Sequence, residues 1–190
     1  TGNLAVSAGT KTASGTITGA TIVGANALYH NGTNNEFSVD KSGTLTTAAQ
    51  TASFGYTSLN AITSGNGNTV FGFAAGKDIT TGNYNTCFGR SAGNSITTES
   101  NNSIFGWVAG NAINGGAANC LFGRNAGTAI TSGNNNICIG YQAGNSLVTG
   151  SSNVLIGYQA GANEAGSNKL YIDNSNTATP LIYGDFSTNA

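Results

Sequence analysis

The stretch that decides the fold runs from residue 136 to residue 152 and reads NICIGYQAGNSLVTGSS. The glycine at its fifth position recurs every 17 residues, at Gly55, Gly72, Gly89, Gly106, Gly123, Gly140 and Gly157. A fixed internal period is the sequence signature of a repeat architecture. The chain therefore contains seven uninterrupted copies of one unit.

Other positions of the unit are restricted too. The residue before the glycine is always Phe or Ile, and the residue three places after it is Ala or Ser. A second glycine stands four places after the first in six of the seven copies, with Leu59 as the exception. An asparagine recurs with the same period, at Asn68, Asn85, Asn102, Asn119, Asn136 and Asn153.

This unit predicts an all-β fold, a parallel β-solenoid with 17-residue coils. Repeats built from helical pairs need about 33 residues or more, so the unit is too short for them. Two short apolar stretches, around Phe/Ile-Gly and around Ile-Thr, predict strand, turn, strand and turn in each coil. Coils stacked about 4.8 Å apart would form a rod roughly 30 Å long. In such a stack the asparagines should form a ladder of side-chain amides.

We expect the Phe/Ile column to point into the coil. Because side chains alternate along a strand, the residues just before it would then point outward. They are apolar from the second copy on, which predicts a seam covered by another chain. This inter-chain seam comprises Val70, Cys87, Ile104, Leu121, Cys138 and Leu155. A thin core also favours oligomerisation, so we expect a parallel homo-oligomer.

The repeat, residues 52–168, has a flanking segment on each side. Residues 1–51 are rich in Thr, Ser and Gly, and their short β elements are expected to depend on neighbouring chains. Residues 36–40 alternate like a half-exposed strand. Residues 169–173 and 180–184 predict two strands that cap the solenoid within residues 169–190, as terminal units of repeat proteins do.

Two copies of the unit carry a family resemblance. Residues 139–144 and 156–161 both read IGYQAG, which resembles repeats of phage tail fibres and large bacterial surface fibres. The unit is also similar to the head repeats of trimeric autotransporter adhesins, although those repeats are shorter. The segment 170–186 resembles the stretch that precedes the self-cleaving intramolecular chaperone of endosialidase-type tailspikes. The resemblance covers about residues 52–186.

The resemblance implies a left-handed β-roll assembled as a parallel homotrimer. It further implies a structural fibre segment, in a virion tail fibre or a cell-surface fibre, that contributes to host or surface attachment. The location would be extracellular, and a chaperone beyond Ala190 would have been removed or would lie outside this sequence.

The composition contains little that points to catalysis or to nucleic acid. Only 7% of the residues are charged and the net charge is −1, which does not favour phosphate binding. The acidic residues within the repeat occupy different columns, so paired carboxylates are not expected to stack. His30 is the only histidine and is expected in a turn at residues 29–32. We expect no catalytic, cofactor or metal site, and, with no apolar run near the ~20 residues that span a bilayer, no membrane insertion.

The three cysteines are Cys87, Cys120 and Cys138. Their odd number does not suit a closed disulfide framework. All three are expected to be small buried hydrophobic residues.

One column could bind a ligand. The residues after the first glycine form an aromatic and arginine stripe, namely Tyr56, Phe73, Arg90, Trp107, Arg124, Tyr141 and Tyr158. Such residues stack on sugars or anchor partner proteins, so a glycan-binding module is the alternative function. The sequence favours the other interpretation, that the stripe packs at a corner of the coil or against an adjacent chain. A column of Thr63, Thr80, Thr97 and Thr131 raises ice binding as a weaker possibility, because Asn114 and Val148 interrupt it.

Overall fold

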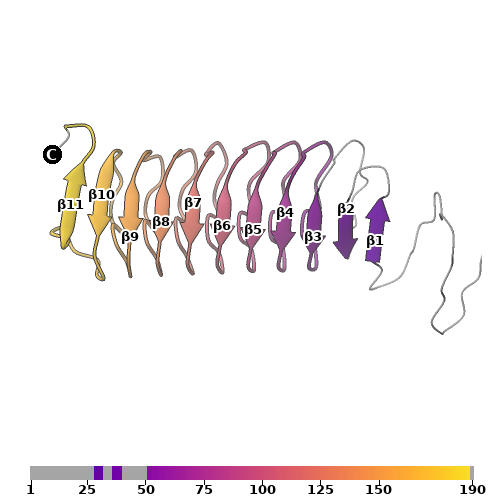
Figure 1. Ribbon diagram of the computed structural model, residues 1–190, viewed down its shortest axis with the longest axis horizontal. Helices are drawn as coiled ribbons and strands as arrows, with labels where there is room; N and C mark the ends of the chain where they lie inside the picture. The colour runs from indigo at the N-terminus through magenta and orange to yellow at the C-terminus, as the bar shows by residue number, and fades with distance from the viewer. Residues whose placement is uncertain (1–27, 32–35, 40–50, 189–190) are drawn as a thin grey trace, which may run out of the picture.

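The computed structural model describes residues 28–31, 36–39 and 51–188, and its eleven strands form one sheet in sequence order (Figure 1). The strands are β1 (Leu28–Asn31), β2 (Glu36–Val39), β3 (Ala52–Phe54), β4 (Thr69–Phe71), β5 (Thr86–Phe88), β6 (Ser103–Phe105), β7 (Cys120–Phe122), β8 (Ile137–Ile139), β9 (Val154–Ile156), β10 (Lys169–Ile172) and β11 (Ile182–Asp185).

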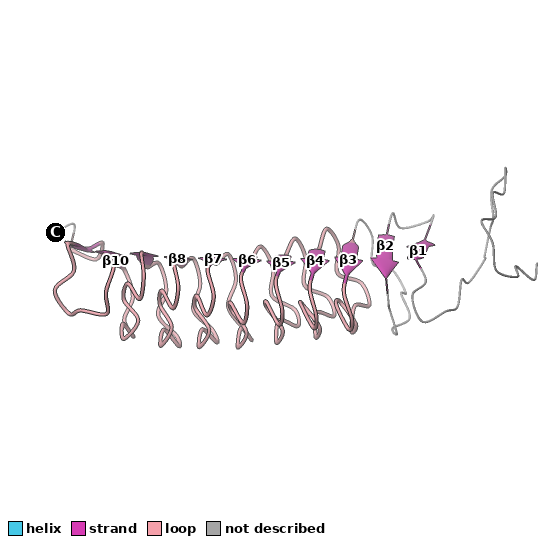
Figure 2. Ribbon diagram, turned by 90° about the horizontal axis from the view of Figure 1, so that it is seen from below, coloured by secondary structure: helices cyan, strands magenta, loops and turns pink. Residues whose placement is uncertain are grey.

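Strands β3 to β9 confirm the predicted solenoid. Each pairs in parallel with the next, and each residue lies opposite the residue 17 places further on, as Val70 does with Cys87. The strands lie along one side of the rod, whereas the loops project from the other side (Figure 2). The sheet is therefore the flat side of the rod.

The second strand predicted in each coil is absent from the described coils. At the Ile-Thr stretch the chain bends, and the N–H groups of Thr63, Ser64 and Gly65 converge on one acceptor, the carbonyl oxygen of Thr80. Three donors sharing one acceptor require a turn, because a strand would direct its N–H groups to alternate sides. Each coil thus has one strand. The rest of the coil consists of turns, which form hydrogen bonds to the adjacent coils along the rod axis.

The predicted orientation of the strands is wrong. Val70, Cys87, Ile104, Leu121, Cys138 and Leu155 are fully buried within a single chain, and the Phe/Ile column points outward. The former residues pack with an alanine column and with the isoleucine column that begins at Ile62. They cannot form the predicted inter-chain seam, because the coil itself encloses them.

Two columns hold the coils close together. Gly106 has a φ of 142°, and a Cβ placed there would lie 2.2 Å from the carbonyl oxygen of Gly123 in the next coil. The predicted asparagine ladder is also present. The amide oxygen of Asn85, for example, accepts hydrogen bonds from the backbone N–H (3.1 Å) and the side-chain Nδ2 (3.2 Å) of Asn102.

Two pairs of strands end the sheet. Strand β1 pairs antiparallel with β2, so His30 lies in a strand and the turn predicted at residues 29–32 is wrong. At the other end β10 continues the parallel stack onto β9, and β11 pairs antiparallel with β10. Most of the N-terminal β segment predicted over residues 1–51 lies outside the described residues.

The structure contains no helix among its described residues that is long and apolar enough to cross a membrane.

Candidate functional site

The outward face of the sheet carries a row of large apolar side chains, here called the outer ladder. It comprises Phe54, Phe71, Phe88, Phe105, Phe122, Ile139 and Ile156. The phenylalanine rings stack along the rod, with centroids 4.9 Å apart between Phe71 and Phe88 and 5.1 Å apart between Phe88 and Phe105. Stacking covers only part of each ring, since Phe54 remains 50% exposed and Phe122 57% exposed.

A second outward row runs beside the outer ladder and also lacks charge. Its members are the first residues of the strands, namely Ala52, Thr69, Thr86, Ser103, Cys120, Ile137 and Val154. It changes from small residues at β3 to β6, three of which carry a hydroxyl group, to larger apolar residues at β8 and β9. Cys120 is exposed in this row, so the prediction that all three cysteines are buried is wrong for Cys120 and confirmed for Cys87 and Cys138.

The aromatic and arginine stripe is one continuous stack along an edge of the sheet. Tyr56 and Phe73 stack with centroids 5.7 Å apart, and Tyr141 and Tyr158 stack 5.2 Å apart. In two of the central coils the stripe residue is an arginine, and each arginine side chain lies between two aromatic rings. The guanidinium carbon of Arg124 lies 4.4 Å from the ring centroid of Trp107, which is within the range of a cation–π interaction.

The backbone fixes the stripe in place. The residue after each stripe residue has a positive φ, such as 55° at Ser91 and 60° at Val108. Carbonyl groups of the stripe accept axial hydrogen bonds, such as the 2.9 Å bond that the N–H of Val108 donates to Arg90. The stripe predicted from the sequence is therefore brought together on a rigid backbone.

The carboxylates of residues 51–188 have structural partners. Asp78 lies 3.2 Å from the ammonium nitrogen of Lys77, and Asp185 lies 2.5 Å from that of Lys169. The nearly buried carboxylate of Glu99 accepts hydrogen bonds from the backbone N–H groups of Thr97 (2.6 Å) and Thr98 (3.0 Å). It occupies a column that is glycine in most coils.

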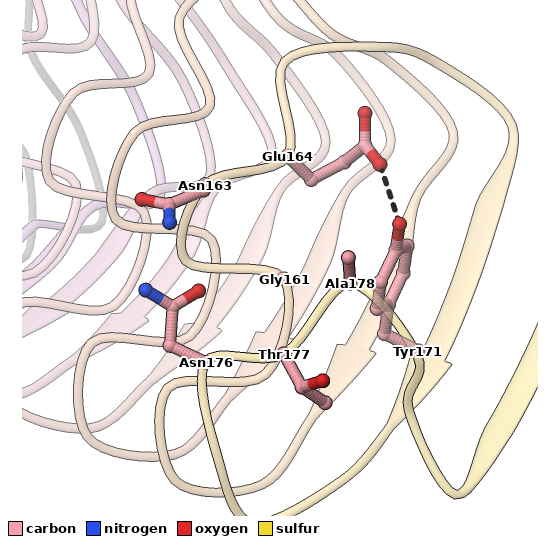
Figure 3. Close-up of a pocket in the computed structure, with 7 residues that line it drawn as sticks. All are labelled: Gly161, Asn163, Glu164, Tyr171, Asn176, Thr177 and Ala178. Atoms are coloured by element: carbon pink, nitrogen blue, oxygen red, sulfur yellow. Dashed lines mark hydrogen bonds between the residues drawn. The ribbon is translucent and has the colours of Figure 1, made fainter.

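A small pocket of about 150 Å³ lies between the last coil and the cap (Figure 3). Its lining residues are Gly161, Asn163, Glu164, Tyr171, Asn176, Thr177 and Ala178. The Tyr171 hydroxyl donates a 2.9 Å hydrogen bond to one oxygen of Glu164. The other oxygen accepts from the N–H groups of Ala165 and Gly166, so this carboxylate is held in place as part of the cap.

The threonine column uses its hydroxyl groups within the rod. The Thr80 hydroxyl donates a 3.1 Å hydrogen bond to the carbonyl oxygen of Thr97, and the Thr131 hydroxyl donates a 3.2 Å bond to that of Val148. These hydroxyls join adjacent coils, which reduces what the column can offer to an external ligand.

Within the part of the chain that the structure describes, no group of three or more His, Cys, Asp and Glu residues is placed to hold a metal ion. No family model, curated protein or solved structure matches this chain.

Proposed function

We propose that this chain is a segment of a parallel homotrimeric fibre, in a phage tail fibre or a bacterial surface appendage, and that it contributes to host or surface attachment. The outer ladder is the observation that carries the proposal. Contiguous exposed apolar surface of this length marks an interaction site in soluble proteins. The fibre role, the extracellular location and the left-handed sense of the roll follow the resemblance to tail-fibre and adhesin repeats.

A second copy of the same rod is the occupant that fits the outer ladder best. The rings repeat at the strand spacing of about 4.8 Å, and another copy presents rings at the same interval. The side chains of two copies can therefore meet in register along the whole outer ladder, whereas a partner with a different spacing would soon lose register. No charged residue lies on the outward face of β3 to β9, so association there would not require a charge to be desolvated.

The proposed number of three copies follows from the family resemblance. The proposed role as a stiff fibre segment follows from the hydrogen bonds between coils. Backbone and side-chain hydrogen bonds join each coil to the next from Thr51 to Asn168. Such a stack resists bending and extension, because any deformation breaks several bonds in the same coil.

The mass of the native particle tests the assembly. We expect three chains for the wild type and single chains for the double variant Phe88→Asn/Phe105→Asn, because it interrupts the middle of the outer ladder. Tyr84→Asn is the control: Tyr84 is an aromatic residue, more exposed than Phe88 or Phe105, that lies outside the outer ladder, and asparagine already occupies its column at Asn101 and Asn135. Circular dichroism should show β structure in all three proteins.

Alkylation of Cys120 gives a second measure of the same interface. The thiol lies on the outward face of the sheet, so it should be protected in the wild-type particle and reactive in the double variant. A wild-type protein that is monomeric at micromolar concentration, with a reactive Cys120, would contradict the trimer. Immunogold labelling of the producing virion or cell tests the fibre role, because the label should follow an extended appendage.

Glycan binding by the stripe is a second candidate function. The observation that favours it is the pair of guanidinium groups that lie beside aromatic rings in the stripe, with neither hydrogen bond nor ion pair to any residue of 51–188.

A further inference from the structure

The two arginines of this chain occupy the same position of the repeat. Arg90 and Arg124 are separated by 34 residues, which is two coils. At the strand spacing, two coils place the guanidinium groups about 9.5 Å apart along the rod. Trp107 lies between them in the intervening coil.

Each guanidinium group lies between two aromatic rings. Arg90 lies 5.6 Å from the Phe73 centroid and 5.9 Å from that of Trp107. Arg124 lies 4.4 Å from the Trp107 centroid and 5.7 Å from that of Tyr141. The rings flank the guanidinium groups, and the N–H groups, which have no hydrogen-bond partner within residues 51–188, remain for a ligand. An arginine held in this way presents a fork that matches a carboxylate or a sulfate.

The rest of the stripe suits a linear ligand that carries hydroxyl groups. The stripe is unbroken over seven coils, and Tyr56, Tyr141 and Tyr158 add phenolic hydroxyls toward its ends. Stacking within the rod occupies the ring faces, which leaves poor platforms for nucleic-acid bases. Recognition would therefore use edges and polar atoms.

We infer that the stripe binds a linear acidic polysaccharide aligned with the rod, with anionic groups of successive disaccharides on Arg90 and Arg124. The two-coil separation is comparable to the length of one disaccharide, so a chain with one carboxylate in each disaccharide matches both arginines. This inference rests on the glycan-binding function proposed for the stripe, and it is independent of the fibre role.

Fluorescence of Trp107 provides the test, because Trp107 is the only tryptophan in the chain. The full protein is titrated with a hyaluronan decasaccharide, which has one carboxylate per disaccharide, and with a chitin oligosaccharide of equal length, which has none. We expect a saturable change with hyaluronan alone, weakened by added salt. Arg90→Gln and Arg124→Gln should each weaken binding about tenfold, the value of a charged hydrogen bond.

Two controls keep the result independent of folding. Lys77→Gln removes a cation outside the stripe, and it should bind hyaluronan as the wild type does. The methyl ester of hyaluronan tests the wild-type protein with the ligand's charge removed, and it should not bind.

Several outcomes would overturn the inference. Equal binding of the chitin oligosaccharide would leave glycan binding intact but reject the anionic ligand, whereas binding of neither sugar would reject both. Binding of a thymidine decanucleotide that is equally sensitive to the arginine variants would identify a different polyanion. Protection of Trp107 from acrylamide quenching in the assembled particle would show that another chain covers the stripe.

Discussion

At the scale of single residues, the asparagine ladder makes a large contribution to stability. The Asn102 amide oxygen accepts two bonds from Asn119, and its Nδ2 donates to Asn85 and to the carbonyl oxygen of Gly116. We expect Asn102→Ala to lower the free energy of unfolding by about 2–4 kcal/mol, because buried polar groups of the adjacent coils lose their partners. Denaturant unfolding of the purified protein measures this loss.

Asn145→Ala is the control for that change. Asn145 is only half-buried, and alanine already occupies its column at Ala162. Its cost should stay within about 0.5 kcal/mol. Equal costs for the two variants would show that the ladder is not a special source of stability.

Substitutions at two glycines can distinguish the cost of a strained backbone conformation from the cost of a steric clash with the adjacent coil. Gly106 and Gly115 both have a positive φ, of 142° and 121°, but the nearest atom to an added Cβ is 2.2 Å away at Gly106 and 3.4 Å away at Gly115. Gly106→Ala should therefore destabilise the protein by about 2–3 kcal/mol more than Gly115→Ala, since it alone must push two coils apart. Thermal unfolding of both variants tests the difference, and equal losses would reject the role of close approach.

At the scale of the strand, the sequence predicts position but not orientation. The period, the strand positions and the asparagine ladder follow from the columns, because identical residues stack only when the coils have equal length. Orientation was missed because Val70 and Phe71 are both apolar, and alternation alone cannot decide which of them faces inward. Thr69, two residues before Phe71, shares its side of the strand, and the hydroxyl residues at this position were the signal for an outward face.

The prediction of a second strand in each coil is wrong for another reason. Ile-Thr has the composition of a strand, but in the first two coils three N–H groups there share one carbonyl oxygen of the adjacent coil. That arrangement depends on the stack as a whole, so local propensity could not show it. The stripe, in contrast, could be predicted from the sequence, since it needs only equal spacing. The stacking of its rings on one another is visible only in the three-dimensional structure.

The cap formed by β10 and β11 should respond to both extremes of pH. The hydrogen bond from Lys169, followed by those from Ser187, lowers the pKa of Asp185 from 3.8 to about 2. A lowered pKa means that the stabilisation is present above pH 4 and disappears as the pH falls toward 2. The amide NMR signals of residues 169–185 should therefore lose their dispersion in acid before those of the coils.

Alkali should weaken the same cap. Burial, followed by the hydrogen bond to Glu164, raises the pKa of Tyr171 from 10.0 to about 12, and the hydrogen bond to Asp185 raises that of Lys169. Raised pKa values mean that both contributions are complete below pH 10 and decline as the pH rises through the folded-state values. Tyr171→Phe should remove a tyrosine transition near pH 12 from the absorbance titration.

Asp173→Asn is the control variant for the acid transition. It removes another carboxylate of the cap, which is half-buried and accepts a hydrogen bond from Ser175. Asp185→Asn should abolish the early loss of the cap in acid, and Asp173→Asn should leave it intact. An unchanged acid transition in Asp185→Asn would contradict the assignment.

At the scale of the whole molecule, the two buried cysteines report on cooperative opening. Burial raises the pKa of the Cys87 and Cys138 thiols to about 12, with a smaller contribution from Cys120 at Cys138. Only a thiolate reacts readily with alkylating reagents, so at pH 8 these two residues should react only when the rod unfolds. Mass spectrometry after timed iodoacetamide labelling in increasing urea should show both thiols becoming reactive together.

Cys87 and Cys138 lie three coils apart, which makes their relative labelling informative. Simultaneous labelling would mean that the coils open as one unit. Labelling of one thiol at clearly lower urea would contradict this and would mark a weaker part of the rod.

The uniform register of the coils has a consequence for how such a protein can change over evolutionary time. Duplication of any 17-residue block adds one rung without altering the contacts at either terminus, and lengthens the rod by about 4.8 Å. Insertions of other lengths would shift the columns that they cross out of the 17-residue register of β3 to β9. Selection can therefore adjust the length of the rod in fixed steps of one coil, and with it the distance between the structures that its two ends connect.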